Sequence, residues 1–201
     1  MAGASGYLRS GLAPVANNRP RSRLFFAAFP DARAAQELSR LAYRLREVHG
    51  LQGTPLSPER LHVTLHFLGD YHAIPESLID SARSAAKLVK LLPFKVVFDR
   101  VTSFDAGSHR RPVVLVASEG MSKLSELHET LRSARHDLGV GSADADTDRI
   151  YVPHLTLLYD SQRLEVSLSD PIEWTVSEFF LIQSLIGQSK YVVLDSRTLF
   201  R

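Results

Sequence analysis

One four-residue pattern, His-x-Thr-Leu, occurs twice in this chain of 201 residues, at 62–65 and again at 154–157. Each copy lies in a run of apolar and β-branched residues that is typical of a strand. Successive side chains of a strand point to opposite faces, so the histidine and the threonine of each copy share one face. Two such strands, separated by nearly half of the chain, predict two similar halves that face one shared site.

The rest of the chain mixes strand and helix patterns. Apolar runs predict strands at 24–29, 61–68, 94–98, 113–117, 151–158, 174–182 and 191–194. Apolar residues at helical spacing predict helices at 32–49, between Asp31 as N-cap and Gly50 as the stop, and at 75–91 and 121–138. Because strands and helices do not alternate strictly, we expect an α+β fold rather than a doubly wound parallel sheet.

The strand that carries the first copy makes further predictions. Strict alternation places His66 on the same face as His62, and it turns Phe67 toward the core. We expect His66 to be solvated or to support the site from outside it. The pair Gly69-Asp70 is a common turn signal, so we expect this strand to end there.

Length and composition exclude several classes of protein. The length fits about one domain, and the absence of cysteine excludes disulfide frameworks, thiolate metal sites and cysteine nucleophiles. No apolar run reaches the roughly 18 residues of a membrane span, and we expect a cytoplasmic monomer. Residues 1–22 are rich in Gly, Ser, Pro and Arg and predict a flexible basic tail before one domain at 23–201.

The net charge of +2 at first suggests a nucleic-acid partner. Four of the 24 basic residues and none of the 22 acidic ones lie in residues 1–30, which leaves 20 basic against 22 acidic residues in 31–201. The basic excess therefore belongs to the N-terminal segment. Net charge alone does not predict that the folded body binds nucleic acid.

The repeated residues suit displacement at phosphorus without a metal ion. The attacking and leaving oxygens lie on opposite sides of phosphorus, so one base and one acid are needed, and His62 and His154 fit either role near neutral pH. The hydroxyls of Thr64 and Thr156 can donate hydrogen bonds to the charged phosphate oxygens. The structural alternative, satisfied histidines and ordinary strand threonines, is favoured for one copy but not for two.

A metal centre is the competing chemistry, with His62, His66 and His154 as conceivable ligands. In a strand, His62 and His66 lie roughly 13 Å apart, which is too far for them to share one ion. We therefore expect no metal.

These motifs and their flanks resemble the 2H phosphoesterase superfamily, and more closely the LigT-like RNA 2′,3′-cyclic phosphodiesterases, also called 2′-5′ RNA ligases. The likeness is carried by residues 23–27, 58–69, 93–94, 149, 153–157, 184–187 and 191. It implies two pseudo-symmetric lobes whose antiparallel sheets form a central groove, with the helices outside.

The resemblance also implies an activity. It implies metal-independent and cofactor-independent hydrolysis of RNA 2′,3′-cyclic phosphate ends to 2′-phosphomonoesters, with weak reversible 2′-5′ ligation. It implies His62 as the proton donor, His154 as the proton acceptor, and Thr64 and Thr156 as phosphate-binding residues. The partner would be an RNA or nucleotide that carries such an end. The residues alone do not fix which histidine is the acid.

One departure from the family pattern is Tyr159, which stands where relatives commonly carry an arginine. An aromatic ring there can stack on a base or join the core. Arg149 matches a family arginine, and Arg110 and Arg111 lie on a loop that can reach the groove, so we expect all four residues to bind substrate. A non-catalytic nucleotide-binding module and an enzyme for another small cyclic phosphate stay open as alternatives.

Overall fold

The structure is a computed structural model that describes residues 21–105, 110–137 and 150–200, the side chains of 135–137 excepted. The predicted tail at 1–22 therefore lies almost wholly outside the described residues, as does Arg149. The first strand begins at Ser22, one residue from the predicted domain boundary. None of the described helices combines the length and the apolar character needed to cross a bilayer.

Eight strands and three α-helices make up the described part of the chain. The strands are β1 (Ser22–Ala28), β2 (Val63–Tyr71), β3 (Phe94–Ser103), β4 (Arg111–Glu119), β5 (His154–Asp160), β6 (Glu165–Val176), β7 (Glu178–Leu185) and β8 (Lys190–Thr198). The helices are α1 (Ala32–His49), α2 (Glu76–Ala86) and α3 (Met121–Asp137), with a 3₁₀ turn, η1 (Pro58–Arg60). All strand pairs are antiparallel, which confirms the predicted α+β class.

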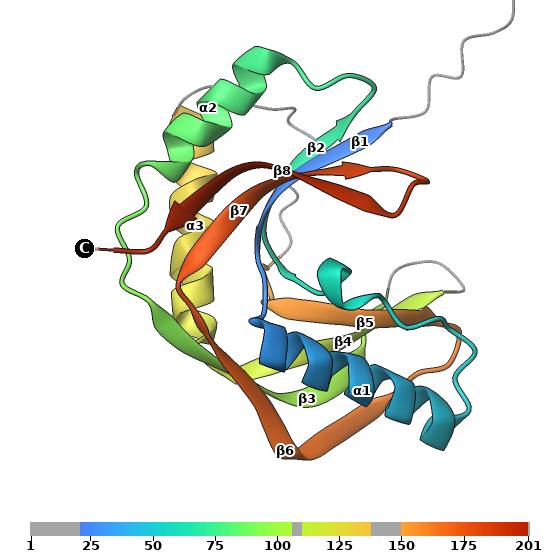
Figure 1. The fold of residues 1–201 in the computed structure, drawn as a ribbon. Coiled ribbons are helices and arrows are strands. Elements are labelled where there is room, and N and C mark those ends of the chain that lie inside the picture. The colour runs from blue at the N-terminus through green and yellow to red at the C-terminus, as the bar shows by residue number, and fades with distance from the viewer. Residues whose placement is uncertain (1–20, 106–109, 138–149, 201) are drawn as a thin grey trace, which may run out of the picture.

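The sheet order is β6-β3-β4-β5-β2-β1-β7-β8, with the two strands of the repeated motif side by side at its centre. A single residue pair, Val63 with Leu155, joins β2 to β5 and so joins the two halves. Each half consists of a motif strand and three further strands. Strands β1, β7 and β8 follow β2 in the upper part of Figure 1, and β4, β3 and β6 follow β5 in the lower part. The predicted pair of similar lobes is therefore present.

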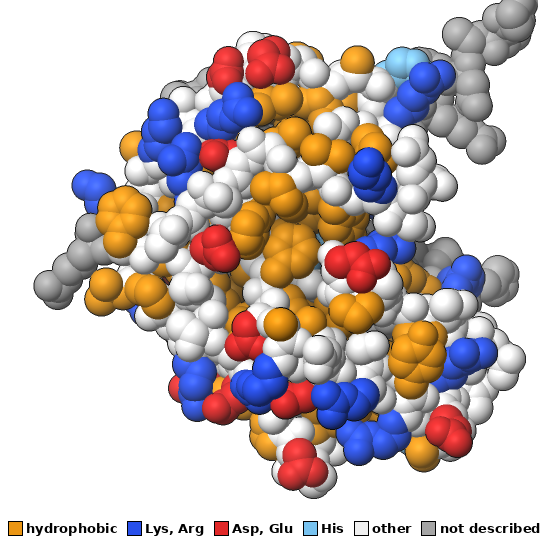
Figure 2. All heavy atoms as spheres, viewed as in Figure 1, with side chains coloured by type: hydrophobic (Ala, Val, Ile, Leu, Met, Phe, Trp, Pro, Cys, Tyr) orange, Lys and Arg blue, Asp and Glu red, His pale blue; other side chains and the backbone are white. Residues whose placement is uncertain are grey.

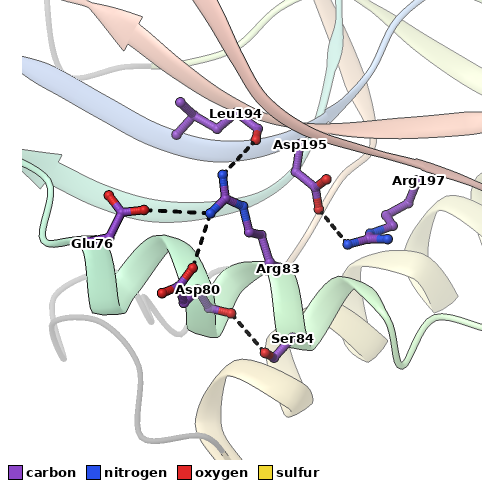
Figure 3. A network of polar contacts seen from close by, with 7 residues as sticks. All are labelled: Glu76, Asp80, Arg83, Ser84, Leu194, Asp195 and Arg197. Carbon is purple, nitrogen blue, oxygen red and sulfur yellow. Dashed lines mark hydrogen bonds and ion pairs between the residues drawn. The ribbon is translucent and has the colours of Figure 1, made fainter.

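The helices cover the sheet in an exchanged arrangement. Helix α1 follows β1 but packs on β5 and β6 of the other half, whereas α3 follows β4 but packs chiefly on β2, with fewer contacts to β4. Helix α2 lies against α3 and β8 (Figure 1). In Figure 3, Arg83 of α2 donates to the carbonyl of Leu194 in β8 at 3.2 Å, which joins this helix to the edge strand. The same guanidinium contacts Asp80 within the helix at 3.1 Å.

The two faces of the sheet differ in what they bury. The large core lies between the sheet and the helices and includes Leu24, Phe26 and Leu155. A small second cluster, Phe25 with Ala27 and Ile182, lies on the opposite face of β1 and β7. We call this opposite face, which no helix covers within the described residues, the front face.

Helix α1 begins and ends at the two residues that the sequence predicts, Asp31 and Gly50. The Asp31 carboxylate accepts from the Ala34 N–H at 2.8 Å, which caps the N-terminus of α1. At the other end Gly50 has φ 65°, the left-handed conformation that glycine adopts most readily.

Several predicted boundaries are wrong. Strand β2 does not end at Gly69 but runs to Tyr71, because a bulge, with Gly69 at φ 136°, lets pairing with β1 continue past the turn signal. The region predicted as one strand at 174–182 is divided at Ser177, between β6 and β7. Helix α2 ends at Ala86 rather than at residue 91.

Candidate active site

The pairing of Val63 with Leu155 sets the geometry of the site. In an antiparallel pair, the next residues along put His62 opposite Thr156 and Thr64 opposite His154. Val63 and Leu155 are buried in the core, so these four side chains are on the front face. Two histidine and threonine pairs thus face each other around a local two-fold axis.

Both imidazoles are held in the same way. The Nδ1–H of His62 donates to the carbonyl of Arg60 at 2.7 Å, and the Nδ1–H of His154 donates to the carbonyl of Val152 at 2.8 Å. A carbonyl oxygen only accepts, so Nδ1 carries a hydrogen in each ring. In the neutral rings Nε2 is then the basic nitrogen, and it is the atom available for proton exchange.

Burial makes both histidines weaker bases than free histidine. Burial lowers the pKa of His62 from 6.5 to about 4, although its hydrogen bond to Arg60 opposes this, and the nearby charge of His154 lowers it further. Burial also lowers the pKa of His154. Both rings are therefore neutral at pH 7 in the protein alone.

The leucine of each motif forms a β-bulge. The pairing of β1 with β2 passes over Leu65, and the pairing of β4 with β5 passes over Leu157. Each bulge adds one residue to its strand and reverses the alternation beyond it. The two motif strands therefore share a distortion at the same position.

The bulges correct the predicted orientation of two residues and decide that of a third. His66 lies on the core side and is 4% exposed, so it is neither on the face of His62 nor solvated. Phe67 lies on the front face and is 37% exposed, rather than turned into the core. Tyr159 occupies the equivalent position on β5 and is also exposed, so it does not join the core.

Aromatic rings surround His62. The ring of Phe25 stacks on the imidazole with centroids 5.2 Å apart, and the rings of Phe29 and Tyr191 lie 5.7 and 5.5 Å from it. The Arg60 guanidinium lies 5.6 Å from the centroid of the Tyr191 ring. His154 has a simpler setting, with the ring of Phe104 edge-on at 4.9 Å.

A cavity of about 510 Å³ opens next to His62. Its lining residues are Phe29, Glu59, Arg60, Phe180, Ile182, Ser189, Lys190, Tyr191 and Val193. In the view of Figure 2, hydrophobic side chains gather over the middle of the molecule, with charged side chains around them. The lining of the cavity itself is mostly apolar, and its charged residues are Glu59, Arg60 and Lys190.

Of the predicted arginines, Arg149 lies outside the described residues, and Arg110 and Arg111 are not part of the central pair of motifs. Arg110 donates to the carbonyl of Tyr159 at 3.3 Å. Arg111 donates to the carbonyl of Ser161 at 2.9 Å and pairs with Asp105 at 3.4 Å, so its guanidinium is already engaged at the start of β4. Among the described residues, no group of three or more histidine or acidic side chains is arranged to hold a metal ion.

Comparisons with known proteins identify the family. The model of the 2′-5′ RNA ligase superfamily matches residues 29–187. The chain belongs to the 2′-5′ RNA ligase superfamily. This confirms the resemblance expected from the repeated motifs.

Solved structures agree on the fold. E. coli LigT in its apo form is 24% identical with a TM-score of 0.72, over 91% of this chain and 99% of LigT. The protein TT0787 of Thermus thermophilus is 26% identical with a TM-score of 0.71, over 88% and 97% of the two chains. Usb1 of Kluyveromyces marxianus shares the fold at 10% identity and a TM-score of 0.52, over 88% and 98%. No curated protein matches this chain.

Within this superfamily fold, the sequence missed the residues that surround the motifs. Tyr191, Phe29 and Phe104 contact the two histidines from elements that are remote in sequence. His128 had a detectable signal, since it follows Leu124 by four residues and so continues the buried stripe of α3 with a polar side chain.

Proposed function

We propose that this protein hydrolyses 2′,3′-cyclic phosphates at the ends of RNA or on nucleotides to 2′-phosphomonoesters, without metal or cofactor. The observation that carries the proposal is the double pair of His62 with Thr156 and Thr64 with His154 across one strand pairing. Two bases and two hydroxyl donors on one face meet the needs of an in-line displacement at phosphorus.

In this proposal His154 Nε2 takes a proton from a water molecule while the oxygen of that water bonds to phosphorus. The bond from phosphorus to O3′ breaks, and His62 Nε2–H gives its proton to that oxygen, which leaves a 3′ hydroxyl and a 2′-phosphate. Thr64 and Thr156 donate to the non-bridging oxygens. The anionic substrate opposes the burial that lowers the pKa of His62, so the acid becomes protonated as substrate binds.

The cavity beside His62 supports this choice of acid. The histidine that protonates O3′ lies next to the ribose, so the terminal nucleoside lies on its side of the phosphate. Aromatic walls such as Tyr191 and Phe29 can stack on a nucleobase, and Lys190 and Arg60 at the rim suit an anionic ligand. E. coli LigT has been crystallised with ATP and with 3′-AMP, which supports a nucleotide as the ligand here.

Tyr159 and the arginines have secondary roles in the proposal. Tyr159 lies on the front face beyond Thr156, where its exposed ring can stack on a base in place of an arginine contact. Arg110, beside the Tyr159 backbone, together with Arg111 and Arg149, extends this side of the site toward RNA. Reversible 2′-5′ ligation, cytoplasmic location and a monomeric state stay predictions.

The test is turnover by the full chain in EDTA. Nucleoside 2′,3′-cyclic phosphates and an RNA with that end are incubated with wild type, His62→Ala, His154→Ala and the exposed control His49→Ala, and the products are separated as 2′- or 3′-phosphates. We expect a 2′-phosphate from wild type and control, and a loss of at least about a hundredfold in either site variant.

Each other outcome has a meaning. Absence of turnover, or turnover that neither site variant reduces, would falsify the proposal. Nucleotide binding without turnover would instead identify a non-catalytic binding module. Turnover only of cyclic phosphates unrelated to RNA would redirect the substrate class, and activity lost in EDTA and restored by a divalent ion would establish a metal enzyme.

A further inference from the structure

The bulges create a structural problem next to each phosphate-binding threonine. A bulge residue is left out of the ladder, so its carbonyl needs another partner, and the strand bends at this point. In β5 the main chain solves the problem, because the Leu56 N–H donates to the carbonyl of Leu157 at 2.8 Å. That loop is further fixed by the N–H groups of Gln52 and Gly53, which donate to the Asp160 carboxylate at 2.6 and 2.7 Å.

In β2 two side chains take this place. His128 of α3 donates from Nδ1–H to the carbonyl of Leu65 at 2.6 Å. The hydroxyl of Tyr151 donates to the carbonyl of Thr64 at 2.9 Å. The two rings stack with centroids 4.0 Å apart and planes at 4°, so each donor orients the other.

This arrangement fixes the two consecutive peptide groups that follow Thr64, because each of them has its carbonyl held. With the carbonyls of Thr64 and Leu65 held, the direction of the Thr64 side chain relative to the front face is set. Burial raises the pKa of the Tyr151 hydroxyl, so it stays protonated and remains a donor. Tyr151 also lies directly before Val152, whose carbonyl holds His154, so this one segment contacts both motifs.

We propose that Tyr151 and His128 are positioning residues that hold Thr64 in its phosphate-binding orientation, and that they act through Thr64 rather than on the substrate. The inference rests on the proposed function. In β2 these two side chains hold the backbone at the bulge, whereas in β5 a backbone N–H does so. Removal of either donor should therefore reduce what Thr64 contributes and leave Thr156 unaffected.

The experiment is a double-mutant cycle on kcat for a nucleoside 2′,3′-cyclic phosphate, measured in single turnover. Tyr151→Phe keeps the stacked ring and removes only the donor, and Tyr43→Phe on the exposed side of α1 is the matched control. We expect Tyr151→Phe to reduce kcat about tenfold with KM changed less than about twofold. We expect the same tenfold loss in a Thr156→Val background but less than about twofold in Thr64→Val.

His128 is tested by rescue. His128→Asn retains an N–H donor near the position of Nδ1 and should keep most of the activity, whereas His128→Leu should lose about tenfold. Equal losses for Tyr151→Phe in both threonine backgrounds, or no loss in the wild-type background, would overturn the inference.

Failure of the proposed function is recognised separately. If the wild-type chain does not turn over cyclic phosphates, that function fails, and the same cycle is measured on affinity for inorganic phosphate by calorimetry. A Tyr151→Phe effect that is confined to backgrounds with an intact Thr64 still supports positioning. Equal effects in both backgrounds, or no phosphate binding by wild type, overturn it.

Discussion

The two halves of the site share a backbone but differ in surroundings. Each has a histidine held through Nδ1 by the carbonyl two residues earlier, a threonine two residues later and a bulge at the next leucine. Among the described residues, three aromatic rings enclose His62, which also borders a cavity, whereas one ring contacts His154.

The difference separates what catalysis requires from what recognition requires. In the proposed reaction, proton exchange at Nε2 and phosphate binding depend on the backbone that the two halves share. The surroundings of the two histidines differ, and the aromatic cavity lies on the His62 side alone. Under the proposed function, this difference gives a symmetric frame a nucleoside side and a water side.

The largest expected effect tests the shared part of the comparison. Thr64→Val and Thr156→Val each replace a hydroxyl by a methyl of similar size, and each should lower kcat by about a hundredfold to a thousandfold, because a donor to the charged transition state is lost. Steady-state kinetics at pH 7 check this, with circular dichroism to confirm folding. A large loss in only one variant would show that the threonines are not equivalent.

The next effect compares the enclosure of the two histidines. The pKa of His62 is lowered to about 4 in the folded chain. Below pH 6.5, His62 is therefore protonated in the unfolded chain but still neutral in the folded one. Between pH 6.5 and pH 4 this costs about 3 kcal/mol of unfolding free energy. Urea unfolding at pH 7 and pH 4 should show a smaller acid loss in His62→Gln than in wild type.

The same measurement on His154→Gln sharpens this prediction. Burial lowers the pKa of His154 in the same direction, with fewer rings around it, so this variant should recover less of the acid loss than His62→Gln does. An equal recovery would mean that the two histidines are enclosed alike, and a larger one that His154 is the more enclosed of the two.

The smallest expected effect tests the direction of the site. Base stacking contributes about 1–3 kcal/mol, so Tyr191→Ala should raise KM for a cyclic nucleotide about tenfold, and Phe104→Ala should raise it less than about threefold. Michaelis constants for both variants on one substrate decide this. The opposite order would place the nucleoside beside His154 and exchange the acid and base roles.

Sequence periodicity predicted the motif strands and the shared face of their histidines and threonines, because alternation in a strand is a local property. It misplaced His66 and Phe67, because a bulge is set by pairing with β1 and leaves no local signal. It also missed Tyr191 and Tyr151, whose contacts to the motifs join residues far apart in the chain.

The exchanged helices have a consequence for how the chain can be divided. Helix α1 comes from the first half and covers the second, while α3 does the reverse. A fragment that ends before α3 would lack the helix that packs on β2, and it would carry α1 without β5 and β6, the strands on which α1 packs. Despite the internal repeat, we therefore expect the molecule to fold as one unit. Two separately expressed parts, divided before α3, should become soluble only when they are produced together.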